Sequence, residues 1–216
     1  MVQKKEMDNG DEKTGTIHQT TIKALPPLVG EPAPLGLLGL AVAALVLAST
    51  DLKLASGSMK SLMIPWVLFF GATAQLIAGS LEFKRQNIFG ATVFSVYAMT
   101  MYSIAVTLCI TIFTGVTFDI THYAYGLIGI LVFSLIATAA SAMTNKAFFA
   151  ILLAVDLAVG LLIPHYLTGF SSQPAGVFLL ITSILSFYTA AAILLNTMAG
   201  KTILPLGKAL WMPVKK

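Results

Sequence analysis

Six long apolar runs, separated by short polar joins, fill most of the chain after residue 30. They lie near 33–50, 62–82, 88–113, 123–143, 147–166 and 174–197. A helix needs about 20 apolar residues to cross a bilayer, and these runs are too long and alternate too weakly to be the strands of a barrel. The pattern therefore predicts an all-α, polytopic membrane protein with six transmembrane helices.

The polar residues outside these runs divide the chain into three parts. Residues 1–25 have mixed charge and no apolar core behind their first lysines, so we expect a disordered tail rather than a secretory signal. Residues 26–200 are expected to form the six-helix transmembrane domain. Residues 201–216 are expected to form a basic cytoplasmic segment.

Charge is scarce, and its placement predicts the orientation of the helices. Only 10% of the residues are charged, against about 25% in soluble domains, so lipid must solvate much of the surface. All of the 13 Lys and Arg residues except Lys53 and Lys60 lie in the tail, the second and fourth joins and the C-terminal segment. The positive-inside rule then predicts a multi-pass plasma-membrane protein with both termini in the cytoplasm. The net charge of +4 is explained by topology and lipid, and we expect no nucleic-acid partner.

The sequence shows no pattern typical of an enzyme or a metal site. His18, His122 and His165 are far apart along the chain, and Cys109 is the one cysteine. No Cys or His pair has the spacing of metal ligands, and no glycine-rich loop leads into a phosphate-binding helix. We therefore expect a protein without catalytic activity, metal or cofactor.

Polar side chains recur at helical spacing within the apolar runs. These candidate pathway residues are Gln75, Thr100, Ser103, Thr107, Ser134, Thr138, Thr182 and Ser186. Stripes of this kind on three helices favour an amphiphilic path for a small polar solute. The alternative is that small hydroxyl residues let helices pack closely and donate to their own carbonyl groups.

Two carboxyl groups are candidates for proton coupling. Asp156 lies near the middle of the fifth run, where an ionised carboxylate costs about 3 kcal/mol or more. It should therefore face the protein interior. Glu82 lies at the cytoplasmic rim of the second run, seven residues after Gln75. Asp156 is either a proton-coupling group or a neutral acid hydrogen-bonded to a neighbouring helix.

Three motifs in this order resemble the acetate uptake transporter family, the succinate–acetate permeases. They are EPAPLGLLGL at Glu31–Leu40, AQLIAGSLEFKRQNIFGATVFSVY at Ala74–Tyr97 and GKTILPLG at Gly200–Gly207. The family pattern has asparagine where this chain has Glu31. The resemblance covers the chain from about Gly30 to Lys208.

The resemblance implies uptake of acetate and succinate through six-helix protomers assembled as a hexamer. Each protomer would have its own pathway, narrowed at Leu40, Tyr97 and Val155. In the first motif, Pro32 and Pro34 would fix the start of the first helix. Gly36 and Gly39 would let a neighbouring backbone or a solute come close. The motif would thus position the constriction.

These observations favour proton-coupled uptake of acetate and related short-chain carboxylates, with Asp156 as the local candidate for coupling. A second hypothesis is passive, channel-like conduction of small anions or of neutral solutes such as ammonia. A third is a membrane assembly or sensor that transports nothing. A continuous wet path separates the first two from the third.

Overall fold

The computed structural model describes residues 29–54, 60–115 and 119–212, so the expected tail at 1–25 lies outside the described residues. Helix α1 covers Ala33–Asp51. The second span begins with a 3₁₀ turn and then runs without a break through three helical segments. The 3₁₀ turn is Lys60–Leu62, and the three segments are α2 at Met63–Trp66, a π-helix at Val67–Ala74 and α3 at Gln75–Lys84. Helices α4, α5, α6 and α7 cover Ile88–Phe113, Thr121–Ser141, Lys146–Thr168 and Gln173–Ala199.

The described part of the chain is all-helical, and six of its helical stretches have the length and apolar composition needed to cross a membrane. The prediction of six helices is confirmed. The fourth predicted helix, 123–143, is displaced by two residues from the observed Thr121–Ser141. Asp119 precedes that helix and accepts hydrogen bonds from the backbone amide and hydroxyl of Thr121. The helix therefore starts with exposed polar residues, which the pattern of apolar residues does not reveal.

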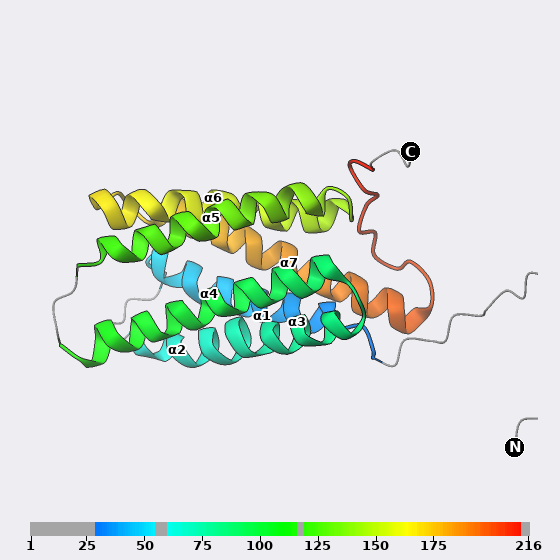
Figure 1. The fold of residues 1–216 in the computed structure, drawn as a ribbon, viewed down its shortest axis with the longest axis horizontal. Coiled ribbons are helices and arrows are strands. Elements are labelled where there is room, and N and C mark those ends of the chain that lie inside the picture. The colour runs from blue at the N-terminus through cyan, green and yellow to red at the C-terminus, as the bar shows by residue number, and fades with distance from the viewer. Residues whose placement is uncertain (1–28, 55–59, 116–118, 213–216) are drawn as a thin grey trace, which may run out of the picture.

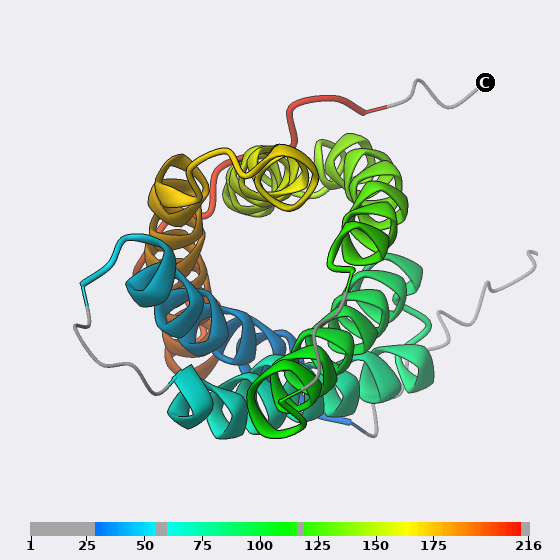
Figure 2. The ribbon, with the colours of Figure 1, turned by 90° about the vertical axis from the view of Figure 1, so that its left-hand side faces the viewer.

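The six spans stand side by side in a ring, as Figures 1 and 2 show. Contacts run from α1 to α7, from α7 to α6 and from α6 to α5, and the π-helix and α3 pack on both α1 and α4. The contact between α4 and α5 that closes the ring is much less extensive. Each of the six spans therefore turns one face toward a common axis.

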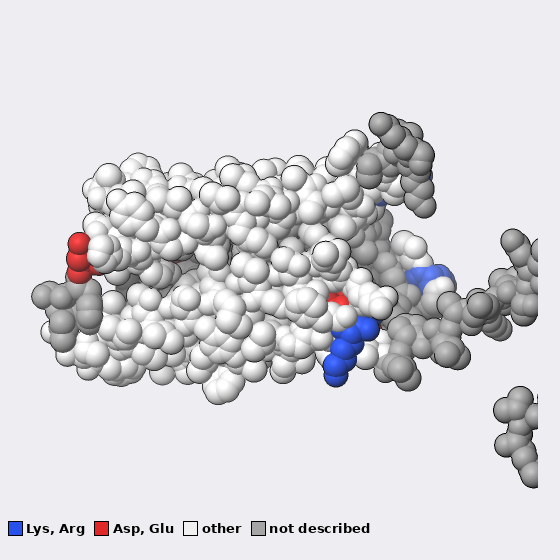
Figure 3. Space-filling model, viewed as in Figure 1, with Lys and Arg blue, Asp and Glu red and all other residues white. Residues whose placement is uncertain are grey.

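The described chain begins and ends at the same end of the ring, since the number of spans is even (Figure 1). We call this the basic end, because its described joins and C-terminal residues hold Lys84, Arg85, Lys146, Lys201 and Lys208. On the face drawn in Figure 3, charged side chains lie toward the two ends and the middle is uncharged. An uncharged band of this kind suits the hydrocarbon core of a bilayer.

The glycines of the first motif hold α1 close to its neighbours. A Cβ atom at Gly36 would lie 2.6 Å from the ring of Phe94, and one at Gly39 would collide with the backbone oxygen of Phe70. The close approach that the motif predicts is therefore made to protein. Because Gly39 directly precedes Leu40, the same contact fixes where Leu40 stands on α1.

The π-helix at Val67–Ala74 lies where α1 presses on the second span. A Cβ atom at Gly71 would lie 2.8 Å from Ala43, and the side-chain amide of Gln75 donates to the Gly71 backbone oxygen over 2.7 Å. A π turn widens the backbone ring and is frequent at functional sites. Here it carries Gln75 to a fully buried position.

The third motif, together with the residues after it, forms a strap of residues 200–212 across the basic end. Gly200, in the left-handed region at φ 63°, ends α7, and Asn196 accepts from the backbone amides of Ile203 and Leu204. Tyr188 donates to the Pro205 oxygen over 2.7 Å. Hydrogen bonds from two side chains of α7 thus hold the strap against the C-terminal half of that helix.

Candidate functional site

The three residues expected at the constriction lie in the same buried apolar cluster. Leu40, Tyr97 and Val155 come from α1, α4 and α6 and are 6%, 3% and 7% exposed. The ring of Tyr97 packs edge-on against Phe133 of α5, with 5.6 Å between the ring centroids. Residues of α1, α4, α5 and α6 thus contribute to this cluster.

A chain of hydrogen bonds leads from Tyr97 to Asp156. The Tyr97 hydroxyl lies 2.7 Å from the hydroxyl of Ser134, which in turn donates to Oδ1 of Asp156. Thr138 donates to Oδ2 of the same carboxyl group over 2.7 Å. All four side chains are buried. The expected constriction and the candidate proton-coupling residue are thus linked through Ser134.

Helical geometry explains why α5 supplies both hydroxyl groups. Ser134 and Thr138 are four residues apart, so they stand one above the other on a single helix face. Asp156 lies on α6, which packs along α5. A carboxylate inside a span is costly, and two hydroxyl donors offset part of that cost. The alternative expectation, an acid hydrogen-bonded to a neighbouring helix, describes these contacts equally well.

Three other hydroxyl groups of the candidate pathway have partners in their own helix. Thr100, Ser103 and Thr182 each donate to the carbonyl oxygen four residues earlier in their own helix. Ser103 is exposed, while Thr100 and Thr107 are half-buried. These contacts fit the packing interpretation of the stripes, so the role of these residues in a pathway stays a prediction.

Besides Oε1 of Glu82 at the basic end, two buried polar atoms within the spans have no hydrogen-bond partner among the described residues. They are Oε1 of Gln75, at the end of the π-helix, and Oγ of Ser186 on α7. Buried polar groups are nearly always paired, so an unpaired one calls for water or a solute. These two atoms are consistent with a path that is wet at least in part.

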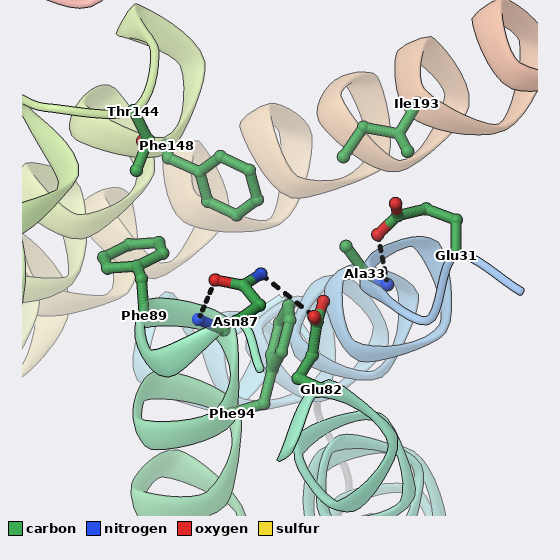
Figure 4. Close-up of a pocket in the computed structure, with 10 residues that line it drawn as sticks. Glu31, Ala33, Glu82, Asn87, Phe89, Phe94, Thr144, Phe148 and Ile193 are labelled. Atoms are coloured by element: carbon green, nitrogen blue, oxygen red, sulfur yellow. Dashed lines mark hydrogen bonds between the residues drawn. The ribbon is translucent and has the colours of Figure 1, made fainter. Parts of the chain in front are cut away.

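A pocket of about 250 Å³ opens at the basic end (Figure 4). Its walls are apolar and aromatic, and the carboxyl group of Glu82 and the amide of Asn87 point into it. Asn87 donates to Oε2 of Glu82 over 2.9 Å, while the fully buried Oε1 has no partner among the described residues. Gly90 makes room for this carboxyl group, since a Cβ atom there would lie 2.9 Å from it.

Glu31, which stands where the family motif has asparagine, has a structural role. Its Oε2 lies 2.6 Å from Nη1 of Arg85, and its Oε1 accepts from the backbone amide of Ala33 over 3.4 Å. The side chain thus ties the start of α1 to the turn after α3. The ion pair has no signal in a single sequence, because Glu31 and Arg85 are 54 positions apart.

The opposite end of the ring carries an exposed carboxyl group and an aromatic cluster. The hydrogen bonds from Thr121 lower the pKa of Asp119 below its ordinary value. Tyr123 of α5 packs edge-on against Tyr166 of α6, with 4.8 Å between the centroids. Among the described residues, no three His, Cys, Asp or Glu side chains gather to hold a metal ion.

Comparison with known proteins finds one family and several relatives, among them a symporter and a permease. The model of the GPR1/FUN34/yaaH family matches residues 14–207. The succinate-acetate/proton symporter SatP of Escherichia coli K12 is 26% identical over 192 residues, which cover 84% of this chain and 97% of the relative. Acetate permease A of Emericella nidulans is 28% identical over 200 residues, which cover 84% of this chain and 67% of the relative.

A solved structure shares the fold. It is described as the structure of the bacterial acetate channel SatP, and it superimposes with a TM-score of 0.76 at 24% sequence identity. The match covers 83% of this chain and 99% of the other. Together with the six spans, these matches make the chain a multi-pass membrane protein.

Proposed function

Because this chain belongs to the GPR1/FUN34/yaaH family, we propose that it carries acetate and related short-chain carboxylates across the plasma membrane, with uptake coupled to protons. The observation that carries the proposal is the pair of relatives named for acetate transport, each aligned over 84% of the chain. Succinate belongs to the proposed substrates because one of these names includes it.

The buried chain at the centre of the ring supports proton coupling. Asp156 is a carboxyl group held in mid-span by hydroxyl donors, one of which also contacts Tyr97. A carboxyl group at that depth can bind and release a proton as the path opens to either side. Leu40, Tyr97 and Val155 are proposed to narrow the path, and the unpaired oxygen of Gln75 to contact water within it.

The distribution of charge supports the proposed orientation. The basic end holds five described Lys and Arg residues, whereas the joins at the opposite end hold Lys53 and Lys60 among those described. Basic joins stay in the cytoplasm, so both termini are placed there. The pocket beside Glu82 is then the cytoplasmic mouth of the path. A homo-oligomer, a hexamer by family resemblance, is part of the same proposal.

Passive conduction is the second candidate, and one observation favours it: the solved structure with the same fold is described as an acetate channel. A channel needs no proton site. If the protein is a channel, the hydroxyl groups that donate to Asp156 only offset the free-energy cost of burying a carboxyl group.

Uptake into liposomes that hold the purified protein tests the proposal. Labelled acetate and labelled succinate are supplied with and without an inward proton gradient, and the rate in empty liposomes is subtracted because neutral acetic acid crosses bilayers unaided. Proton-coupled transport predicts uptake above the equilibrium level in the presence of the gradient. Asp156→Asn is expected to abolish this accumulation. Saturable flux that ignores the gradient would indicate a channel. No flux from folded protein would favour an assembly or sensor.

A further inference from the structure

The direction of the hydrogen bonds between Tyr97 and Asp156 depends on whether Asp156 carries a proton. An ionised carboxylate only accepts hydrogen bonds, so Ser134 must give its single hydroxyl proton to Asp156. Ser134 can then only accept from Tyr97. The Tyr97 proton is therefore committed to Ser134, and the constriction has no hydroxyl donor to offer a passing carboxylate.

Protonation of Asp156 allows the opposite direction. The acid donates to the oxygen of Ser134, Ser134 donates to the oxygen of Tyr97, and the Tyr97 proton becomes free. Thr138 keeps its bond to Oδ2, which leaves Oδ1 as the atom facing Ser134. The same three side chains thus exist in two states that differ in what Tyr97 presents to its surroundings.

We propose that Ser134 is a positioning residue that transmits the protonation of Asp156 to Tyr97, so that the Tyr97 hydroxyl donates to the substrate carboxylate only when Asp156 is protonated. The inference rests on the proposed function for its substrate and on the contacts above for its mechanism. The relay couples substrate binding to proton binding, because Tyr97 binds the substrate carboxylate only while Asp156 holds a proton. It also makes Ser134, an uncharged residue, a determinant of coupling.

Among the described residues, Tyr97 is the titratable side chain that is connected to Asp156 by hydrogen bonds, through Ser134. Helices α5 and α7, which pack on α6, contain no Asp, Glu, Lys or Arg. Tyr188 of α7 donates its hydroxyl to the strap at the basic end. The remaining titratable side chains of α5 and α6 lie in terminal turns: His122, Tyr123, Tyr125, Lys146, His165 and Tyr166.

Exchange of labelled acetate at equal pH on both sides of the membrane tests the relay. As the pH is lowered until Asp156 is protonated, the wild-type rate above empty liposomes is expected to rise about tenfold, the effect of one added hydrogen bond to a charged group. Ser134→Ala frees the Tyr97 hydroxyl at every pH. Its rate is expected to be independent of pH and, at alkaline pH, higher than that of the wild type.

Matched variants separate the relay from a merely structural role. Thr138→Ala removes the other donor to the same carboxyl group but leaves the link to Tyr97, so its rate should still rise as the pH falls. Ser134→Thr keeps a hydroxyl group and should restore the slope. Tyr97→Phe should be slow and flat. If Ser134→Ala lowers the rate equally at every pH and keeps the wild-type slope, the relay is wrong.

Infrared difference spectra of protein with isotope-labelled tyrosine give a readout that does not need transport. Titration of Asp156 should shift the phenol band of Tyr97 in the wild type and in Thr138→Ala, but not in Ser134→Ala. A shift without any acetate flux would support the relay and overturn the proposed function. Flux without a wild-type shift would overturn the relay and leave the proposed function standing.

Discussion

At the scale of single residues, the site is built from side chains whose partners lie far away in the sequence. Glu31 stands where the family motif has asparagine, and its contact with Arg85 gives this departure a physical account. The two side chains are 30% and 23% exposed, so solvent screens their attraction. Exposed ion pairs are worth about 0.2–1 kcal/mol, and this one belongs in that range.

A double-mutant cycle measures the Glu31–Arg85 pair. Glu31→Gln and Arg85→Gln are each expected to lower the free energy of unfolding of the purified protein, with a coupling of about 0.5 kcal/mol between them. High salt should reduce the coupling because the pair is partly exposed. A coupling near zero at low salt would show that the backbone contact of Glu31 with Ala33 carries its role instead.

The link between Ser134 and Asp156 shows what the sequence does and does not reveal at this scale. Both residues lie 11 positions from Asn145, one on each side. Asn145 caps α6 through the backbone amide of Phe148, so it marks the turn of an antiparallel helical hairpin. Ser134 lies seven residues before the end of α5, and Asp156 lies ten residues after the start of α6. The helical hairpin could therefore be predicted from the sequence, whereas the partner of Asp156 and the contact with Tyr97 depend on how the helices pack.

At the scale of elements, apolar runs and their joins were enough to predict all six spans, and the first and third begin at the predicted residues. The π-helix inside the second span was not predicted. Its residues are almost uniformly apolar, so no periodicity distinguishes a π turn from an α turn there. Its cause is tertiary: Gly39 and Gly71 bring α1 and this segment into close contact.

Gly39→Ala tests the contact between α1 and the π-helix. The added methyl group would collide with the Phe70 backbone oxygen and press on Ala74 at 3.3 Å, so the variant should lose about 1–3 kcal/mol of unfolding free energy. Gly160→Ala in α6 is the matched control. Nothing lies within 4 Å of a Cβ atom there, and alanine favours a helix over glycine, so its stability should stay equal or rise. Equal effects of the two substitutions would contradict the packing argument.

At the scale of the whole molecule, every span carries exposed large apolar side chains, and the face drawn in Figure 3 is uncharged between its two ends. Lipid or further copies of the chain must cover these side chains, and the outward faces suit either. The sequence predicted the six-helix architecture through the length of its apolar runs. It could not predict the order of helices around the ring, because that order follows from packing between runs of similar composition.

Labelling of introduced cysteines tests the orientation in intact cells. In a Cys109→Ser background, a membrane-impermeant thiol reagent should label Asp119→Cys but label Lys208→Cys only after the cells are opened. These positions lie at opposite ends of the ring, so the positive-inside rule predicts opposite results for them. The reverse pattern would place the pocket beside Glu82 at the external mouth.

The π-helix has a consequence for how relatives of this chain are aligned. Its i to i+5 bonds take up about one residue more than a regular helix needs over the same rise. In a relative whose second span is a regular α-helix, the residues equivalent to Gln75 and Glu82 would lie on the same faces only if the segment before them were one residue shorter. A single-residue gap within 67–74 would then mark a change of helical winding rather than a lost contact, and forcing that gap closed would rotate every later position of the span onto the wrong face.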